Sequence, residues 1–338
     1  MCNTAVFYGK ELARYGFGES HPFGNDRLDA FWTVFRKECL QNAGSANGSG
    51  RHFADSIRIE QPALATDDKD SPLCGFHGRN YIEFVRKSSV AGTGYLDRGD
   101  TPAFTGVYEA GLYVVGTTLS ALDMVMTGRD SMGNKIEHAM NPIGGLHHAR
   151  RDAAGGFCVF NDIGVAIIAA RKKYGVKKIA YVDIDAHHGD GVFYEFEDDP
   201  LVIFADIHED GRYLYPGTGF PGEIGRGAAE GTKLNIPLEP GAGDEEFSAA
   251  FAAVEQFVDA AEPELIILQS GADGLDGDPI THLKYSSKSH RLAADSLHRL
   301  AHRHCAGRII ALGGGGYNRA NIGYAWTEVV KSLAGPPV

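Results

Sequence analysis

Four apolar segments, each closing on polar or glycine-rich residues, constrain the fold of this chain more than any other feature. They span 177–185 (KKIAYVDID), 200–208 (PLVIFADIH), 263–273 (PELIILQSGAD) and 307–318 (GRIIALGGGGYN). Short, continuous apolar runs of this kind are typical of strands that are buried on both faces of a parallel sheet. The sequence therefore predicts a central parallel sheet.

Helical patterns alternate with these segments. Residues 105–128 and 243–263 carry caps or acids early and apolar residues at three-to-four spacing. The alternation predicts an α/β fold with helices flanking the parallel sheet on both faces. Ligands of such sheets bind at the carboxyl ends of the strands. The acids, histidines and glycines that close the four segments therefore predict one shared site at these ends.

Length, charge and cysteine content restrict the class of protein. The 338 residues suit one large α/β domain, which we expect to span 1–338. A formal net charge of −12 argues against a nucleic-acid binder and would not repel a cationic substrate. Five scattered cysteines without a CxxC pair favour a reducing compartment. With no secretory signal and no apolar run of about 18 residues, we expect a cytoplasmic protein without a membrane span. Residues 41–52 (QNAGSANGSGRH) are predicted to form a surface loop.

The segment YVDIDAHHGDG at 181–191 concentrates ionisable side chains at the end of a predicted strand. Residues two apart on a strand point to the same side, so Asp183, Asp185 and His187 project together if the extended geometry persists. A salt-bridged strand end is the simpler interpretation of one such acid, but this combination favours a bound metal. Asp273, at the end of another strand, completes a set of two carboxylates and one histidine. Three protein ligands with open positions are typical of catalytic zinc.

Two adjacent histidines, His147 and His148, lie in a glycine-containing stretch upstream. A surface pair is the alternative interpretation. Asp183 and Asp190 remain after the ligands are assigned, and each could orient one imidazole and raise its pKa. Two His–Asp dyads beside a metal-activated water would be acid–base machinery for hydrolysis. His188 is expected to be structural.

The run GGGGYN at 313–318 follows the last strand. A phosphate loop is a competing interpretation, but the Gly-Lys-Ser/Thr ending is missing. Glycines let the backbone approach a site closely, and Tyr317 could donate its hydroxyl to a developing oxyanion. Core packing is the alternative role for this tyrosine.

Taken together, these motifs resemble the zinc-dependent histone deacetylase superfamily. GGLHHARRDAAGGFCVFND, YVDIDAHHGDGV, YPGTGF, GADGLDGDP and GGGGYN occur in family order, together with HPFGNDRLDAF and RGDTPAFTGVYEA near the start. The resemblance covers nearly the whole chain. Its details look most like class I enzymes and bacterial acetoin-utilisation deacetylases. It implies the single-domain, arginase-like α/β fold.

The resemblance also implies roles for individual residues. Asp185, His187 and Asp273 would bind one catalytic Zn²⁺, or Fe²⁺ or another divalent metal. His148 with Asp190 would be the general base, His147 with Asp183 would tune charge or assist protonation, and Tyr317 would polarise the acyl carbonyl. The substrate would lie in a narrow tunnel and at its mouth, against Phe157, Tyr215, Gly156, Gly315, Ile280 and Asp100.

A structural potassium ion behind the zinc is a further implication of the resemblance. It would be bound by backbone oxygens of Asp183, Asp185, His187 and Ile207 and by the side chain of residue 206. That residue is Asp206 here, where relatives commonly have serine. An added carboxylate would strengthen cation binding or alter the local charge.

The expected reaction is hydrolysis of acetyl or another short acyl group from lysine in a protein or peptide. An acetylpolyamine amidohydrolase, acting on a small acylated amine by the same mechanism, is the alternative. An arginase-type ureohydrolase with two manganese ions and a catalytically dead binding protein are further alternatives. The dead protein would be expected to lack a ligand or the tyrosine, and neither is lost here. The oligomeric state stays open.

Overall fold

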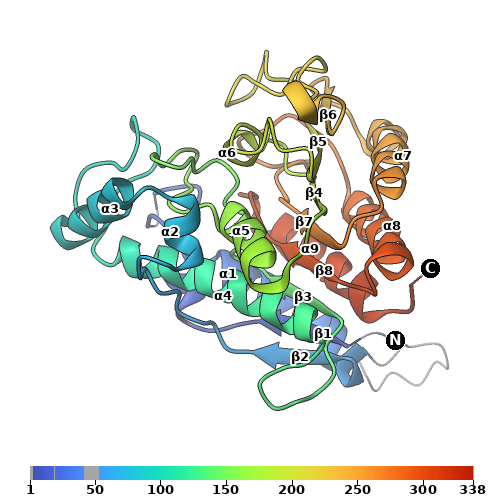
Figure 1. The fold of residues 1–338 in the computed structure, drawn as a ribbon, viewed down its shortest axis with the longest axis horizontal. Coiled ribbons are helices and arrows are strands. Elements are labelled where there is room, and N and C mark those ends of the chain that lie inside the picture. The colour runs from blue at the N-terminus through green and yellow to red at the C-terminus, as the bar shows by residue number, and fades with distance from the viewer. Residues whose placement is uncertain (1–2, 19, 42–52, 338) are drawn as a thin grey trace.

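The computed structural model describes residues 3–18, 20–41 and 53–337 (Figure 1). Within these residues, eight parallel strands form one sheet in the order β2-β1-β3-β8-β7-β4-β5-β6. The strands are β1 (Thr4–Phe7), β2 (Ile57–Glu60), β3 (His138–Asn141), β4 (Ile179–Asp183), β5 (Val202–Glu209), β6 (Lys233–Leu238), β7 (Leu265–Gln269) and β8 (Ile309–Leu312).

The helices alternate with the strands along the chain. They are α1 (Arg27–Phe35), α2 (Pro72–Phe76), α3 (Arg79–Ala91), α4 (Val107–Thr127), α5 (Asp162–Tyr174), α6 (Asp190–Phe193), α7 (Asp244–Ala261), α8 (Ser287–His304) and α9 (Arg319–Ala334). A π-helical turn, Arg36–Gln41, continues α1, and 3₁₀ turns cover Leu12–Arg14, Phe53–Asp55 and Gly227–Ala229.

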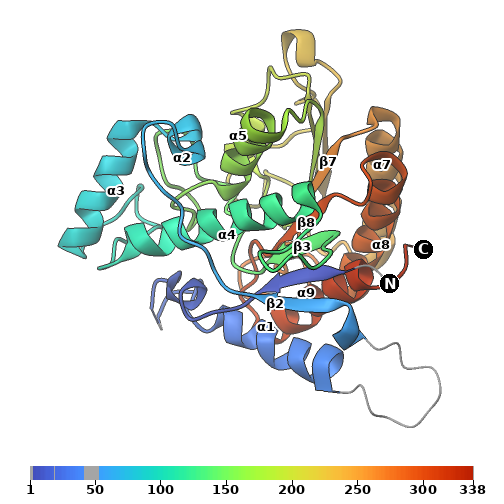
Figure 2. The same ribbon diagram turned by 60° about the horizontal axis from the view of Figure 1, so that its bottom comes forward.

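The helices cover both faces of the sheet, as predicted for an α/β fold. Helices α4 and α5 pack against each other on one face, and α1, α9, α8 and α7 follow one another across the other face (Figure 2). The strands that they cover are almost wholly apolar and buried. Burial of both faces explains why these strands read as continuous apolar runs in the sequence.

The four predicted strands are all present as β4, β5, β7 and β8, although three of them end earlier than their apolar segments suggest. In β4 the ladder stops at Asp183, so Asp185 and His187 lie in the loop beyond the sheet. The expectation that these side chains share one strand face is therefore wrong. They are brought together by a tight loop in which the backbone N–H of His187 donates to the Asp185 carboxylate, 3.0 Å.

The first and last parts of the chain share one hydrophobic core. Strands β1 and β8 both pair with β3, and α9 packs against α1. We infer from these contacts that 1–338 is a single domain. Helix α4 is long and apolar enough to cross a membrane, but 67% of the relevant window is buried inside the fold, as in a core helix. The predicted surface loop 41–52, apart from Gln41, lies outside the described residues.

Gly116 fixes how closely α4 approaches the segment before α2. An added Cβ would lie 2.3 Å from the Ala63 carbonyl oxygen and 2.4 Å from the Ala65 nitrogen, both backbone atoms. Alanine favours a helix over glycine by about 1 kcal/mol, but overpacking costs about 1–3 kcal/mol. We expect Gly116→Ala to lower the urea midpoint of unfolding. Gly222→Ala, where the added Cβ meets nothing within 4 Å, should leave it unchanged. A midpoint for Gly116→Ala at or above that of the unsubstituted protein would contradict this account.

Candidate active site

The predicted site residues gather at one edge of the sheet, where β4, β7 and β8 end. Asp185 and His187 follow β4, Asp273 follows β7, and Tyr317 follows β8. The loop after β3 brings His147 to the same place, where it lines one cavity with Asp185, His187 and Tyr317. This edge is the usual ligand-binding edge of a parallel α/β sheet.

Asp185, His187 and Asp273 converge through one oxygen or nitrogen each. The Nδ1 atom of His187 lies 3.1 Å from Asp185 Oδ1 and 3.0 Å from Asp273 Oδ2. Potential ligand atoms of all three residues lie within 4.8 Å of one another, and all three side chains are buried. The spacing is compatible with a single ion bound between them.

The remaining oxygens of the two carboxylates are held by neighbouring donors. Asp185 Oδ2 accepts hydrogen bonds from the Gln269 side chain and the Gly315 backbone, both 2.7 Å, and Asp273 Oδ1 accepts from the Ala186 backbone, 2.8 Å. Gly315 has no room for a side chain, because a Cβ would lie 2.1 Å from Asp273 Oδ2. These contacts leave Asp185 Oδ1 and Asp273 Oδ2 facing His187.

The electrostatics of this cluster fit a divalent cation. Burial, and then the negative charge of Asp185, raise the pKa of Asp273 to about 7. Two carboxylates buried side by side are costly unless a positive charge compensates them. Two carboxylates and one imidazole are also a suitable donor set for an open zinc site. The residues present therefore fit the metal that the sequence predicts.

Two histidine–aspartate pairs lie next to this cluster. His147 Nδ1 lies 2.8 Å from Asp183 Oδ2, and His148 Nδ1 lies 2.7 Å from Asp190 Oδ1. The Nε2 atoms of the two imidazoles are 3.0 Å apart, and His147 Nε2 is 3.9 Å from Asp185 Oδ1. The structure thus brings together the pairs expected from the sequence.

The two imidazoles differ in charge although both are buried. Burial disfavours the charged form of His147, but the carboxylates of Asp183 and Asp185 outweigh it and raise the pKa of His147 to about 9. Burial, and then the positive charge of His147, lower the pKa of His148 to about 4 against the opposing effect of Asp190. The two pKa values are thus shifted in opposite directions, which favours a proton on His147 and a neutral His148 at neutral pH.

Tyr317 is held by the loop that follows β8. Its backbone N–H donates to Asp278 Oδ2, 2.8 Å. The buried Arg27 guanidinium donates to the carbonyls of Gly314, 2.5 Å, and Gly316, 3.0 Å, from the other side of the loop. Together these charge-assisted hydrogen bonds fix the backbone on which the tyrosine ring projects.

Aromatic rings stand around the site. The Phe157 ring centroid lies 5.8 Å from that of Tyr317, and the Tyr215 ring centroid lies 5.0 Å from that of His148. Gly156, with a φ of +49°, passes so close to His148 that an added Cβ would lie 2.3 Å from the imidazole. The predicted tunnel residues Gly156, Phe157 and Tyr215 therefore border the candidate base and tyrosine.

The two predicted rim residues, Asp100 and Ile280, do not border the cavity but contact residues close to the site. The exposed Asp100 accepts a hydrogen bond at its backbone oxygen from His21, 3.2 Å, whose ring packs 4.6 Å from that of Phe157. Half-buried Ile280 donates its N–H to Asp278 Oδ1, 3.0 Å, on the carboxylate that also holds Tyr317. Asp100 is thus linked through His21 to Phe157, and Ile280 through Asp278 to Tyr317.

The cavity above the metal-ligand cluster is small. Its volume is ≈ 10 Å³, which is about the space that one water molecule needs. Besides predicted residues, the lining includes several positions that the sequence analysis did not select, namely Phe23, Gly145, Leu146, Cys158 and Gly314.

Four residues that position the site escaped the sequence analysis. Gln269 binds Asp185, and its polar side chain at the end of an apolar strand was a usable signal. Arg150 donates to Asp190 Oδ2, 2.6 Å, and Tyr181 donates to Asp183 Oδ2, 2.5 Å. Arg27 lies within the HPFGNDRLDAF segment, but no local pattern identifies its contact with the loop that follows β8.

The predicted potassium ligands lie around Asp206, beside Asp183 in the register of β5 and β4. Asp206 Oδ1 lies 2.7 Å from His208 Nδ1, and its Oδ2 accepts from the Gly189 backbone, 2.8 Å. The Asp206 carboxylate thus already has two partners within the protein. Potassium binding here, through Ile207 and the other expected oxygens, stays a prediction.

His188 points away from the cluster. Its Nδ1 lies 2.8 Å from Thr218 Oγ1, and its ring packs against those of Phe193 and Phe204. These contacts agree with the structural role expected for it.

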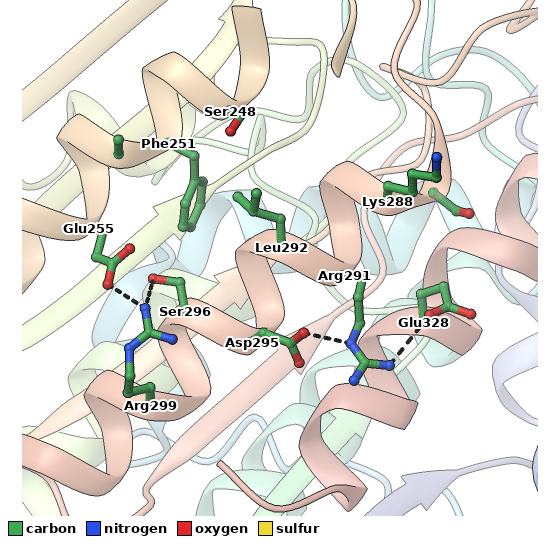
Figure 3. Close-up of a pocket in the computed structure, with 12 residues that line it drawn as sticks. Ser248, Phe251, Glu255, Lys288, Arg291, Leu292, Asp295, Ser296, Arg299 and Glu328 are labelled. Carbon is green, nitrogen blue, oxygen red and sulfur yellow. Dashed lines mark hydrogen bonds and ion pairs between the residues drawn. The ribbon is translucent and has the colours of Figure 1, made fainter. Parts of the chain in front are cut away.

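A larger groove between α7 and α8, with a volume of ≈ 730 Å³, lies away from the site (Figure 3). Its charged side chains pair with one another: Arg291 with Asp295, 2.7 Å, and Glu328, 3.6 Å, and Arg299 with Glu255. Lys288 also lines the groove and lies outside these pairs, so most but not all of the groove's charges are paired within the described residues.

Comparison with known proteins places this geometry in a family. Residues 21–333 match the histone deacetylase domain. The chain is 37% identical to the acetoin utilization protein AcuC of Bacillus subtilis (strain 168), over 99% of this chain and 83% of that protein. It is 32% identical to AcuC of Staphylococcus aureus (strain MRSA252), over 100% and 83%. The crystal structure of the HDA15 HD domain superposes with a TM-score of 0.84 at 27% identity, covering 98% of this chain and 88% of that one. The chain belongs to the histone deacetylase family.

Proposed function

We propose that this protein is a zinc-dependent deacylase that hydrolyses acetyl or another short acyl group from lysine side chains. The observation that carries the proposal is the convergence of Asp185, His187 and Asp273 beside a neutral imidazole, His148, and the tyrosine Tyr317. Family membership supports deacetylation. The contacts around the site support the individual roles that follow.

Asp185, His187 and Asp273 would hold the metal, as zinc is general in the histone deacetylase family and these donors suit it. When bound, a divalent metal here would polarise the acyl carbonyl and lower the pKa of a water molecule. Fe²⁺ accepts the same oxygen and nitrogen ligands. The charge-neutralising need of the two buried carboxylates supports one divalent ion at this position.

His148 is the base of the proposed reaction. Its low pKa keeps the imidazole neutral at pH 7, so Nε2 can accept a proton from the attacking water. Asp190 holds the other ring nitrogen and stabilises the imidazolium that forms. His147 is already protonated, so its charge stabilises developing negative charge, and a protonated imidazole of the pair supplies the proton to the leaving amine.

Tyr317 is the proposed oxyanion donor. Burial, and then the carboxylates of Asp273 and Asp185, raise the pKa of Tyr317 well above its usual value. The phenol therefore keeps its proton and can donate a hydrogen bond to the substrate oxygen. Its position on a loop fixed by Arg27 means that little reorganisation is needed at the moment of reaction.

The surroundings of the site favour an acylated lysine as substrate. The rings of Phe157 and Tyr215 offer apolar walls to the aliphatic part of a lysine side chain, and the exposed carboxylate of Asp100 can accept hydrogen bonds from a peptide backbone. An acylated polyamine is the second candidate, favoured by the net charge of −12. Turnover of an acetyl-lysine peptide and of acetylputrescine should be compared, and preference for acetylputrescine would overturn the choice of substrate.

We expect Tyr317→Phe to lower kcat by about 100-fold to 1,000-fold, because it removes one oxyanion donor without removing the ring. The measurement is steady-state hydrolysis of an acetyl-lysine peptide, with zinc content determined in parallel. Zinc content should be unchanged, since Tyr317 is not among the three ligand candidates. Undiminished kcat in this variant would exclude the proposed oxyanion role.

Gly156→Ala tests whether the placement of His148 matters for turnover. The new methyl group would meet the imidazole at 2.3 Å, and φ is +49°, so His148 must move. A misplacement of about 1 Å can cost about 100-fold in rate. Gly155→Ala is the matched control, because its Cβ would lie 3.2 Å from the end of the Tyr215 side chain and at an ordinary 3.6 Å from the His148 backbone oxygen, without touching the imidazole. We expect kcat to fall about 100-fold for Gly156→Ala and only a few-fold for Gly155→Ala; equal values would argue against His148 as the base.

A further inference from the structure

Three histidines form a second cluster, at the opposite edge of the sheet from the candidate active site. His138 is the first residue of β3, and His298 and His302 lie one turn apart on α8. Their ring centroids are 4.6 Å (His138–His298), 5.3 Å (His138–His302) and 4.9 Å (His298–His302) apart. Because the strands are parallel, the start of β3 lies at the amino edge, whereas the acids of the active site lie at the carboxyl edge.

Local structure explains why these rings meet. Residues four apart on a helix share one face, so His298 and His302 project together. His138 pairs with Ile309 in the ladder between β3 and β8, which lies beside α8. Gly307, just before β8, passes so close that an added Cβ would lie 3.3 Å from His302 Nε2.

The hydrogen bond of His138 fixes its tautomer. Its Nδ1 lies 2.7 Å from the carbonyl oxygen of Gly307, which can only accept, so Nδ1 carries the proton. The lone pair is therefore on Nε2, which faces the other two rings. Metal-binding histidines almost always donate their second ring N–H in this way to a carbonyl or carboxylate.

The spacing of the cluster suits a metal ion. His138 Nε2 and His302 Nε2 are 3.4 Å apart, and one nitrogen of each ring lies within 4.8 Å of the others. Two nitrogens bound tetrahedrally to zinc at about 2.0–2.1 Å are separated by about 3.4 Å.

His298 supplies independent evidence. It is fully buried, and neither ring nitrogen has a hydrogen-bond partner of ordinary geometry within the described residues; the Ser332 backbone is close enough to oppose the fall in its pKa. A buried polar group without a partner is costly, so such a group calls for an explanation. If the cluster were only a hydrogen-bonded pair of His138 and His302, His298 would remain unexplained.

The pKa shifts of the three histidines are consistent with metal binding. Burial, and then the neighbouring histidines, lower the pKa of His138 well below its usual value, and the same causes lower that of His298 to about 4. Neutral imidazoles are the form that binds metals. Burial also lowers the pKa of His302, against the opposing effect of the Glu137 carboxylate.

We propose that His138, His298 and His302 bind a divalent transition-metal ion, with Zn²⁺ the best match, at a site separate from Asp185, His187 and Asp273. Three neutral imidazoles suit zinc and other late first-row ions and offer little to Mg²⁺ or Ca²⁺. The bound ion would link β3 to α8. Because the two sites occupy opposite edges of the sheet, two ions per chain would not be a dinuclear centre of the ureohydrolase type.

The test is zinc stoichiometry of the full chain, stripped with a chelator, reloaded with Zn²⁺ and measured by atomic emission. We expect two zinc ions per chain for the unsubstituted protein and one for His302→Gln. The zinc affinity of the histidine cluster should fall by more than about 100-fold in this variant, because loss of an outer-shell partner alone costs about 10–100-fold. His302 is only half-buried, so this variant should fold. His304→Gln is the matched control on the same helix, where the histidine pairs with Asp259, and should keep two ions.

A second variant separates this proposal from the proposed function. Asp273→Asn removes a ligand candidate of the active site, so this variant should bind one ion, at the histidine cluster. The double variant Asp273→Asn/His302→Gln should bind none. X-ray absorption at the zinc edge should report imidazole ligands for that remaining ion. If the unsubstituted protein binds one ion and folded Asp273→Asn binds none, the cluster site is wrong while the active-site metal stands. Two ions in His302→Gln would also overturn it.

Discussion

Two carboxylates buried against each other, those of Asp185 and Asp273, are the constraint on which the rest of the site depends. Neither reaches bulk water, and the charge of Asp185 helps to raise the pKa of Asp273 to about 7. Backbone N–H groups and Gln269 satisfy one oxygen of each, so the remaining oxygens face His187. Such an arrangement destabilises a fold unless a cation compensates it. The packing, as well as the residue types, therefore favours a cation at this position.

The charges of these buried carboxylates also shift the pKa values of two adjacent imidazoles in opposite directions. His147 lies against Asp183 and near Asp185, so it holds a proton, and that proton lowers the pKa of His148. A pair of neighbouring groups whose environments push their pKa values apart can serve as an acid and a base at one pH. Neither dyad would have these properties alone. Tyr181 donates to Asp183 and Arg150 donates to Asp190, and the Arg150 charge helps to lower the pKa of Asp190.

The sequence was informative where chemistry follows a buried strand. Long apolar runs identified β4, β5, β7 and β8, and the acids and glycines after them identified the site, because parallel strands end at one edge. Strands β1 and β3 are four residues long, as β8 is, but each begins with a polar residue and β3 also ends on one, so neither forms a continuous apolar run. The loop geometry of His187, the role of Arg27 and the closeness of Gly156 to His148 arise from contacts across the fold. No local pattern encodes such contacts.

The histidine cluster is a second case in which contacts across the fold cannot be predicted from a local sequence pattern. His298 and His302 have helical i, i+4 spacing that alone suggests a shared face, but their partner His138 lies about 160 residues earlier, and only strand pairing brings it near. In a parallel sheet the carboxyl edge carries catalysis and the amino edge is left for stability. An ion at the amino edge would tie the strand before the His147–His148 loop to the helix before β8. It would thereby hold the amino ends of β3 and β8 in place. The carboxyl ends of these two strands lead into the loops that carry the histidine pair and Tyr317.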